Sequence, residues 1–203
     1  TGCGNVVCID ARTGQPLWRF QMSHGGVNSG VILHDDVVVA VHGKENLDAT
    51  DIGRMVAIKK PVKLPGPGEL ALVLGKEDEK WRNNELEAFT STPVYRENRI
   101  YCTSKTGVLL CLNAATGDII WQLKLAPDQV HASPLWADGK LYVPMFDGKC
   151  FIVRDNGDSG EKLDEVQLDG ACLAAPSASY GRLFVQSKKR LYCFGSKTPA
   201  PEF

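Results

Sequence analysis

The chain has 203 residues, 43% of them hydrophobic, and a net charge of −1. Its length suits one or two domains of ordinary size. The near-neutral charge gives no support to a nucleic-acid or membrane-surface partner. No apolar run approaches the roughly 18 residues that a membrane-spanning helix needs, so we expect no transmembrane segment.

One sequence pattern recurs along the chain. It consists of a glycine-led apolar strand, an Asp or Asn, a Thr-Gly or Ser-Gly turn, and a second strand. Trp18 and Trp121 close the first two copies, whereas Asp164 stands where the tryptophan of the third is expected. The copies occupy residues 4–18, 107–121 and 148–164. Such repetition predicts a fold built from repeated units.

The repeat has a constant period. Pro93, Pro134 and Pro176 are 41 and 42 residues apart. A period of about 40 to 45 residues with four short strands per unit is typical of a propeller blade. The fold class predicted is therefore all-β, a β-propeller of four-stranded antiparallel blades.

The clearest blade has strands at 92–95, 99–104, 108–112 and 119–125. Its turns contain Gly and Asn, which tolerate the positive φ of tight hairpins. The same central hairpin recurs at 140–153 and turns at Asp147 and Gly148.

Two insertions interrupt the period, because Trp18 and Trp81 are 63 residues apart rather than 40. Nine extra residues fall within 42–52, and 14 more fall within 59–80. We interpret both as enlarged loops and not as a new domain. Residues 61–68 are proline-rich and predict an extended segment. The run that follows, 69–74, is apolar enough to cover a neighbouring surface.

The strand pattern predicts a single partial propeller domain over 1–203. Residues 1–20 supply two strands of one blade, 24–85, 89–125 and 130–168 supply three blades, 172–195 supply three strands of a further blade, and 196–203 form a tail. This is about four blades' worth of strands. Because the third strand of a blade is represented at both ends, we expect a piece of a seven- or eight-bladed propeller. Its open edges predict pairing with the remaining blades or self-association.

Seven cysteines make an odd number, so at least one is unpaired within the chain. Cys8, Cys111 and Cys193 share one phase of the repeat, which predicts equivalent interior positions in different blades. We expect free cysteines that act as small buried hydrophobes. A pair of Cys102 and Cys111 across one hairpin stays open. The absence of a Cys-x-x-Cys pair leaves redox and zinc sites without support.

The segments 8–18 and 111–121 resemble the tryptophan-docking repeat of quinoprotein-like (PQQ-like) β-propellers. The resemblance implies that each tryptophan packs between neighbouring blades and that the Thr-Gly turn holds it in place. It assigns this structural docking to Trp18, Trp81 and Trp121, with the turn glycines Gly14 and Gly117. Asp164 departs from the pattern, and the blade of Trp81 has lost its Thr-Gly turn to an insertion.

Members of that family differ in function. Some are dehydrogenases that hold pyrroloquinoline quinone and calcium on the propeller axis. Others, such as the lipoprotein of the outer-membrane β-barrel assembly machinery, keep only the fold and bind partner proteins. The segments expected to line the axis here carry small and neutral residues, without a carboxylate cluster. They are 27–29, 90–92, 131–133 and 173–175. We therefore expect no cofactor, with PQQ and calcium only under the dehydrogenase alternative, and no catalytic residue.

The first insertion supplies the candidate binding residues. Successive loops of a blade alternate between its two faces, so this insertion is expected to share a face with the segments that enter the first strands. Oxygen ligands at alternate spacing would suit a calcium loop. A metal loop, a partner-binding loop and a plain solvated loop stay open as interpretations. The residues concerned are His42, Glu45, Asn46, Asp48 and Asp51, with His131 farther round the rim.

We therefore predict a non-catalytic propeller scaffold that mediates protein or ligand binding in a bacterial envelope protein. The expected location is periplasmic or cell envelope, and a signal sequence is not present in this chain. A segment of a PQQ-dependent dehydrogenase and a sensor propeller of a signalling protein are the alternatives. The partner is expected to be another protein or the remaining blades of the parent propeller, and not a nucleic acid.

Overall fold

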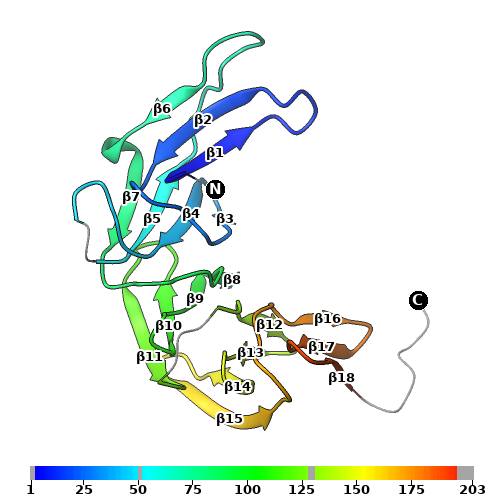
Figure 1. The fold of residues 1–203 in the computed structure, drawn as a ribbon. Helices are drawn as coiled ribbons and strands as arrows, with labels where there is room; N and C mark the ends of the chain where they lie inside the picture. The colour runs from blue at the N-terminus through cyan, green and yellow to red at the C-terminus, as the bar shows by residue number, and fades with distance from the viewer. Residues whose placement is uncertain (1–2, 50–51, 128–130, 196–203) are drawn as a thin grey trace. The chain divides into compact units, whose positions relative to one another are not determined.

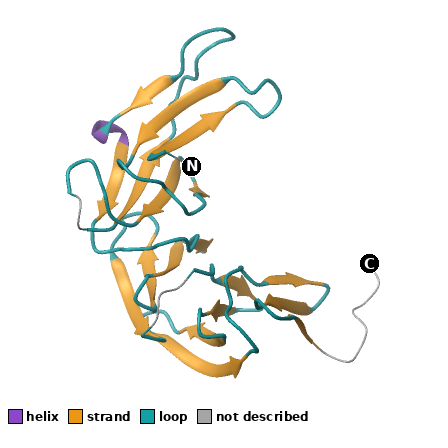
Figure 2. Ribbon diagram, in the orientation of Figure 1, coloured by secondary structure: helices purple, strands orange, loops and turns teal. Residues whose placement is uncertain are grey.

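The computed structural model describes residues 3–49, 52–127 and 131–195. Within them the chain forms eighteen β-strands and one short 3₁₀ turn (Figures 1 and 2). The predicted all-β class is confirmed. The chain divides into two compact units. One contains the residues up to Phe89 together with 113–118, and the other contains Thr90–Leu112 and the described residues from Ile119 onward.

Two sheets form the first unit. The first has the order β1-β2-β6 and the second the order β3-β4-β5-β7. Strand β4 is buried along its whole length and β5 is buried except at Lys59, because both read as continuous apolar runs between their ends. The strands are β1 (Asn5–Ile9), β2 (Pro16–Gln21), β3 (Ile32–His34), β4 (Val37–His42), β5 (Arg54–Lys59), β6 (Leu72–Leu74) and β7 (Glu79–Asn83), with the 3₁₀ turn at Lys76–Asp78.

Strand β6 lies in the second insertion and departs from the expected loop. Leu72, Val73 and Leu74 pair in parallel with Trp18, Arg19 and Phe20 of β2. The sequence predicts that the run covers a surface, and the structure shows that it does so by hydrogen bonding to a sheet edge. The parallel direction is possible because the long stretch of chain between β2 and β6 allows β6 to enter the sheet in the same direction as β2.

The second unit contains three sheets in simple antiparallel order. Two have four strands, β8 to β11 and β12 to β15, and the last has three, β16 to β18. Their strands coincide with those expected from the repeat to within about two residues. The strands are β8 (Val94–Arg96), β9 (Arg99–Thr103), β10 (Val108–Asn113), β11 (Ile119–Lys124), β12 (Leu135–Ala137), β13 (Lys140–Pro144), β14 (Lys149–Asp155), β15 (Gly160–Gln167), β16 (Ser177–Ser179), β17 (Arg182–Gln186) and β18 (Leu191–Gly195).

Four sheets share one register at the tryptophan position. Each tryptophan, or Asp164 in the third copy, pairs with a residue of the adjacent strand, and a β-bulge follows directly. A repeated bulge fixes the register, because it changes the pairing by one residue at the same place in every sheet. The pairs are Trp18 with Cys8, Trp81 with Ala57, Trp121 with Cys111 and Asp164 with Ile152.

Two tryptophans each lie against a glycine from the Thr-Gly or Ser-Gly turn of the next repeat along the chain. A Cβ on Gly117 would clash with the ring of Trp81, and one on Gly160 would clash with the ring of Trp121. Trp81 Nε1 donates to the Ala114 carbonyl over 2.9 Å. These turn glycines are required because the indole occupies the space of a side chain. Gly14 differs, since nothing lies near its Cβ direction, although its φ of +73° also favours glycine.

Trp18 is buried in the first unit. Its cluster includes Phe20, Val38, Ala40 and Ile58. The ring therefore serves as a core residue between the two sheets of that unit, without a turn glycine beneath it in the part of the chain that the structure describes. The second insertion replaces the turn that would have supplied one.

The cysteines are all free. Cys111 is buried, but Cys193 is exposed and Cys8 is half-buried, so the expectation of equivalent interior positions is wrong. The difference has a physical cause. Strand β10 has a neighbour on each side, whereas β1 and β18 each have one neighbour among the described strands. Burial raises the pKa of Cys111 to about 11, which makes its thiol unreactive near neutral pH.

Among the described residues, no helix has the length and apolar character that crossing a membrane requires.

Candidate functional site

The first insertion connects β4 to β5 and is anchored on the segment that follows β2. The hydroxyl of Ser23 and the backbone N–H of His24 both donate to the Glu45 carbonyl, over 2.9 and 2.8 Å. Ser23 and Asn46 also form an isolated antiparallel bridge. The loop therefore begins as a short extension of backbone pairing within the first unit.

Glu45 has an unusual backbone conformation at this anchor. Its φ is +69°, in the left-handed region that few residues with a side chain adopt. Its carboxylate lies where a Cβ on Gly25 would be, so the Glu45 side chain would have to move if position 25 carried a side chain. The carboxylate of Glu45 thus packs over a glycine.

Asp48 is the centre of an ion-pair network. It lies 2.6 Å from Nη1 of Arg54 and 2.8 Å from Nη1 of Arg82. The side chain of Arg54 is only 4% exposed, whereas that of Asp48 is 52% exposed. Arg54 Nε also donates to Asn84 Oδ1, and Arg82 makes a two-pronged pair with Glu79. The hydrogen bond from Arg54 lowers the pKa of Asp48, so its carboxylate stays charged at neutral pH.

We predict that Asp48→Asn loosens the loop without unfolding the unit. The exchange removes the charge that two guanidinium groups share, but half of Asp48 is exposed, so the loss of stability should be only about 1 kcal/mol. Amide hydrogen exchange in residues 43–49 should accelerate about fivefold, the factor that corresponds to about 1 kcal/mol. The same release is expected in the parent protein as the pH falls through the lowered pKa of Asp48, because a depressed carboxyl pKa stabilises the folded state only above it.

The matched control for this prediction is Asp36→Asn. Asp36 is an exposed carboxylate of the same unit that pairs with Lys80 over 3.2 Å, away from the loop. It should leave the exchange of 43–49 unchanged. Equal acceleration in both variants would show that Asp48 does not hold the loop.

His42 and Asn46 are buried and incompletely bonded. Nε2 of His42 and Oδ1 of Asn46 have no hydrogen-bond partner in the described part of the chain. Nδ2 of Asn46 donates to the Ile52 carbonyl, which closes the loop on itself. Burial lowers the pKa of His42, which keeps the ring neutral at physiological pH. The two unpaired atoms retain the capacity to bond a water or a ligand.

The remaining predicted residues lie elsewhere. Asp51 falls outside the described residues. His131 belongs to the other compact unit, where its ring packs against Phe146 and its carbonyl accepts from the Thr90 hydroxyl over 3.0 Å. The structure brings together His42, Glu45, Asn46 and Asp48 in one loop of the first unit and describes His131 separately.

Two expected sites concern a metal loop and the propeller axis. The described residues contain no group of three or more His, Cys, Asp or Glu side chains arranged to hold a metal ion. Serines expected on the axis bond within the fold instead. Ser29 donates to the Val41 carbonyl, and Ser91 bonds the Thr103 hydroxyl. The calcium loop stays a prediction.

Sequence reasoning missed the arginines of the network. Arg54 begins an otherwise apolar strand, Gly-Arg-Met-Val-Ala-Ile, and Arg82 follows the buried Trp81. A charged residue in such a strand requires a partner when the strand is buried. A buried Arg54 therefore indicates that an acidic partner lies close by, and the β4–β5 loop contains one in Asp48.

Comparisons with known proteins agree with the fold. A family model described as outer membrane protein assembly factor BamB matches residues 71–163. The chain is 28% identical over 109 residues to the outer membrane protein assembly factor BamB of Alteromonas naphthalenivorans, a match that covers 46% of this chain and 26% of that protein. These findings, with the repeat and its sheets, show that this chain is similar to PQQ-like β-propeller proteins.

Solved structures agree at the level of the fold. BamB from Moraxella catarrhalis superimposes with a TM-score of 0.66 at 17% identity, over 96% of this chain and 53% of that one. The computationally designed Ika8 protein gives 0.66 at 12% identity over 97% and 54%. The designed Ika4 protein gives 0.57 at 11% identity over 83% and 90%. The chain thus spans about a quarter of the curated relative and about half of the BamB structure.

Proposed function

We propose that this chain is part of a non-catalytic propeller scaffold that binds another protein in the bacterial envelope. The observation that carries the proposal is the match of residues 71–163 to a family described as an outer membrane protein assembly factor. A periplasmic or envelope location follows from the same resemblance. The relative's name connects that protein to outer membrane assembly, and the proposal extends this role to the present chain.

The loop between β4 and β5 is the proposed contact surface. Asp48 ties this loop to Arg54 and Arg82, and Leu47 beside it is 44% exposed. Ile52 is also exposed. Ion pairs that anchor part of a loop reduce the conformational entropy lost on binding, and exposed apolar side chains beside them favour association with a protein partner. Pairing through the edges of β1 and β18 is a second proposed mode of association.

Site-specific photo-crosslinking tests this surface. A photoreactive phenylalanine analogue at Leu47 is expected to capture one envelope protein that functions in outer membrane assembly. Leu64 is the matched control, because it is a leucine of the other insertion with 46% exposure. Equal adducts at both positions, or capture of proteins unrelated to assembly, would count against the proposed surface.

A second prediction separates the scaffold from the dehydrogenase alternative. The purified chain should reduce no dye with alcohols or sugars when supplied with pyrroloquinoline quinone and calcium. The reason is that a general base must be a titratable side chain near the substrate proton. Serines at the expected axis are bonded within the fold. A quinoprotein alcohol dehydrogenase serves as the positive control. Stoichiometric quinone binding with dye reduction would overturn the scaffold.

A further inference from the structure

An apolar cavity of about 650 Å³ lies within the second unit. One side is formed by the sheet β12 to β15 and the other by the sheet β16 to β18. This volume is in the range of ligand pockets, which are usually lined by apolar side chains with a few polar groups. Its lining includes Tyr142, Cys150, Ile152, Leu183, Val185 and Phe194.

In the preceding pair of sheets of the same unit, two indoles lie in the corresponding space between the sheets. Tyr101 of β9 stacks on Trp136 of β12, with ring centroids 5.3 Å apart, and lies 6.1 Å from the ring of Trp121. All three belong to one apolar cluster. The packing of this pair therefore depends on one aromatic from strand β11 and one from β12.

Both indoles are missing at the equivalent positions of the next pair. Trp136 pairs with Leu141, and Ala178 pairs with Leu183 at the same place in its own sheet. Asp164 stands at the bulge position that Trp121 occupies in its sheet, and it is exposed. Tyr142, the counterpart of Tyr101 one period later, lines the cavity. Ala178 also lines the cavity, which therefore lies where the counterpart of Trp136 would pack, and Asp164 supplies no second indole to fill it.

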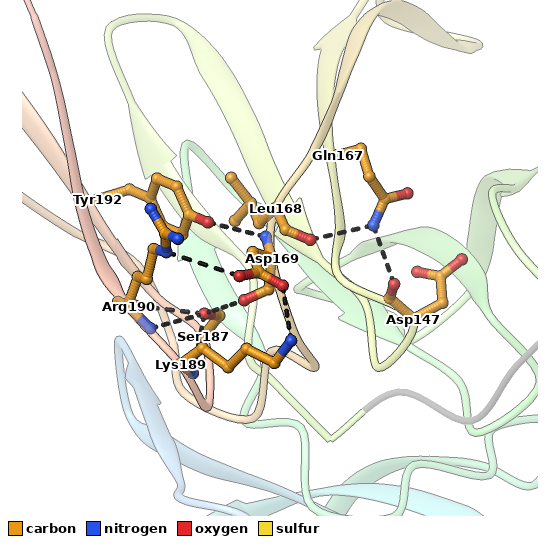
Figure 3. A network of polar contacts seen from close by, with 8 residues as sticks. All are labelled: Asp147, Gln167, Leu168, Asp169, Ser187, Lys189, Arg190 and Tyr192. Carbon is orange, nitrogen blue, oxygen red and sulfur yellow. Dashed lines mark hydrogen bonds and ion pairs between the residues drawn. The ribbon is translucent and has the colours of Figure 1, made fainter.

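The two sheets that form the cavity are also joined by polar contacts at the turn of the β17–β18 hairpin. Asp169 pairs with Lys189 over 2.9 Å, and its backbone N–H donates to the Tyr192 hydroxyl (Figure 3). The buried Ser187 hydroxyl donates to the Asp169 carbonyl over 2.7 Å. Gln167 donates to the Asp147 carbonyl nearby. These contacts hold the β17–β18 turn against the preceding sheet, whereas the cavity extends to Arg182 and Gly195, which pair with each other at the opposite end of the hairpin.

We propose that this cavity is a binding site for a planar aromatic ligand of indole size. Apolar walls and Tyr142 supply the surface against which an aromatic ring packs, as Tyr101 does for Trp136. Arg182 at the rim offers a guanidinium that can lie over a ring face, whereas the carboxylate of Asp138 is already paired with Lys140 over 2.7 Å. The site is independent of the proposed protein-binding loop, which belongs to the other unit.

The test uses 5-fluoroindole as the probe and fluorine NMR of the full chain as the readout. Saturable binding is expected, with nuclear Overhauser contacts from the ring to the methyl groups of Ile152 and Val185. Ala178→Trp and Asp164→Trp each restore one missing indole. Each should weaken the probe's affinity at least tenfold, and Ala178→Trp should also raise the thermal unfolding midpoint. Lys63→Trp, in the insertion of the first unit, adds an indole elsewhere and should leave affinity unchanged.

Three results would overturn the proposal. They are the absence of saturable binding to the parent protein, Overhauser contacts to residues outside the cavity, and affinities within twofold of the parent in both Ala178→Trp and Asp164→Trp. The Overhauser contacts are measured on the unaltered protein, so this part of the test does not depend on how either variant folds.

Discussion

Replacement of Trp121 by alanine is expected to lower the free energy of unfolding by about 3 to 5 kcal/mol, the usual cost of truncating a buried aromatic. The indole is buried in the apolar cluster of the second unit. Its ring lies over Gly160, and its Nε1 donates to Asp155 Oδ1 over 3.0 Å. The variant therefore loses buried apolar area and leaves a carboxylate oxygen with fewer donors. Urea denaturation followed by circular dichroism measures the change.

Gln122→Ala is the control for this measurement. Gln122 neighbours Trp121 on β11 but is exposed, so its truncation should change the free energy of unfolding by less than about 0.5 kcal/mol. A midpoint for Trp121→Ala within error of the parent would show that the ring does not support the packing of the two sheets.

Asp155→Ala is expected to destabilise the same unit by about 3 kcal/mol, near the lower end of the cost of breaking a buried ion pair. The side chain is 7% exposed and lies 2.9 Å from Nη1 of Arg99. It also accepts from the Tyr101 hydroxyl over 2.6 Å and from Trp121. Burial and this carboxylate raise the pKa of Tyr101, so its phenol stays a hydrogen-bond donor at neutral pH. Loss of Asp155 removes the acceptor of the Tyr101 hydroxyl and the Trp121 indole N–H and the charge partner of Arg99, and it frees the Gly157 backbone N–H as well.

Asp158→Ala tests whether the effect belongs to this network. Asp158 is exposed three residues farther along the same turn and accepts from the neighbouring Ser159 hydroxyl. It should change stability by less than about 0.5 kcal/mol. Similar losses for Asp155→Ala and Asp158→Ala would assign the effect to the turn as a whole and not to the buried acceptor.

The repeat made most of the fold predictable. Evenly spaced markers such as Pro93 and Pro134 locate equivalent strands, because each unit must present the same apolar faces to its neighbours. The bulge after Cys111 and the parallel pairing of Leu72 were not predictable in this way. A bulge depends on local pairing, and a strand within an insertion has no counterpart in the other units.

The candidate site was less predictable than the fold. The sequence located the loop and its acidic residues, since an insertion is visible as a break in the period. It did not indicate that Arg54 and Arg82 would hold Asp48, because these two arginines lie on separate strands that are distant from each other in the sequence. Beside the cavity and Tyr142, Ala178 and Asp164 stand where the preceding pair of sheets has tryptophans. Only the loss of tryptophan at Asp164 could be read from the sequence as a departure from the repeat.

Strand β6 has a consequence for solubility. The outermost strand of an ordinary sheet presents unpaired backbone groups, which can pair with another molecule and start aggregation. In the first sheet, Leu72, Val73 and Leu74 pair with that edge of β2 and themselves become the outermost strand. This new edge is only three residues long, whereas β2 has six residues, so it offers a strand from outside fewer backbone groups to pair with. An insertion that serves as a connection in the repeat thus replaces a longer edge by a shorter one, and its deletion would expose the edge of β2 to intermolecular pairing.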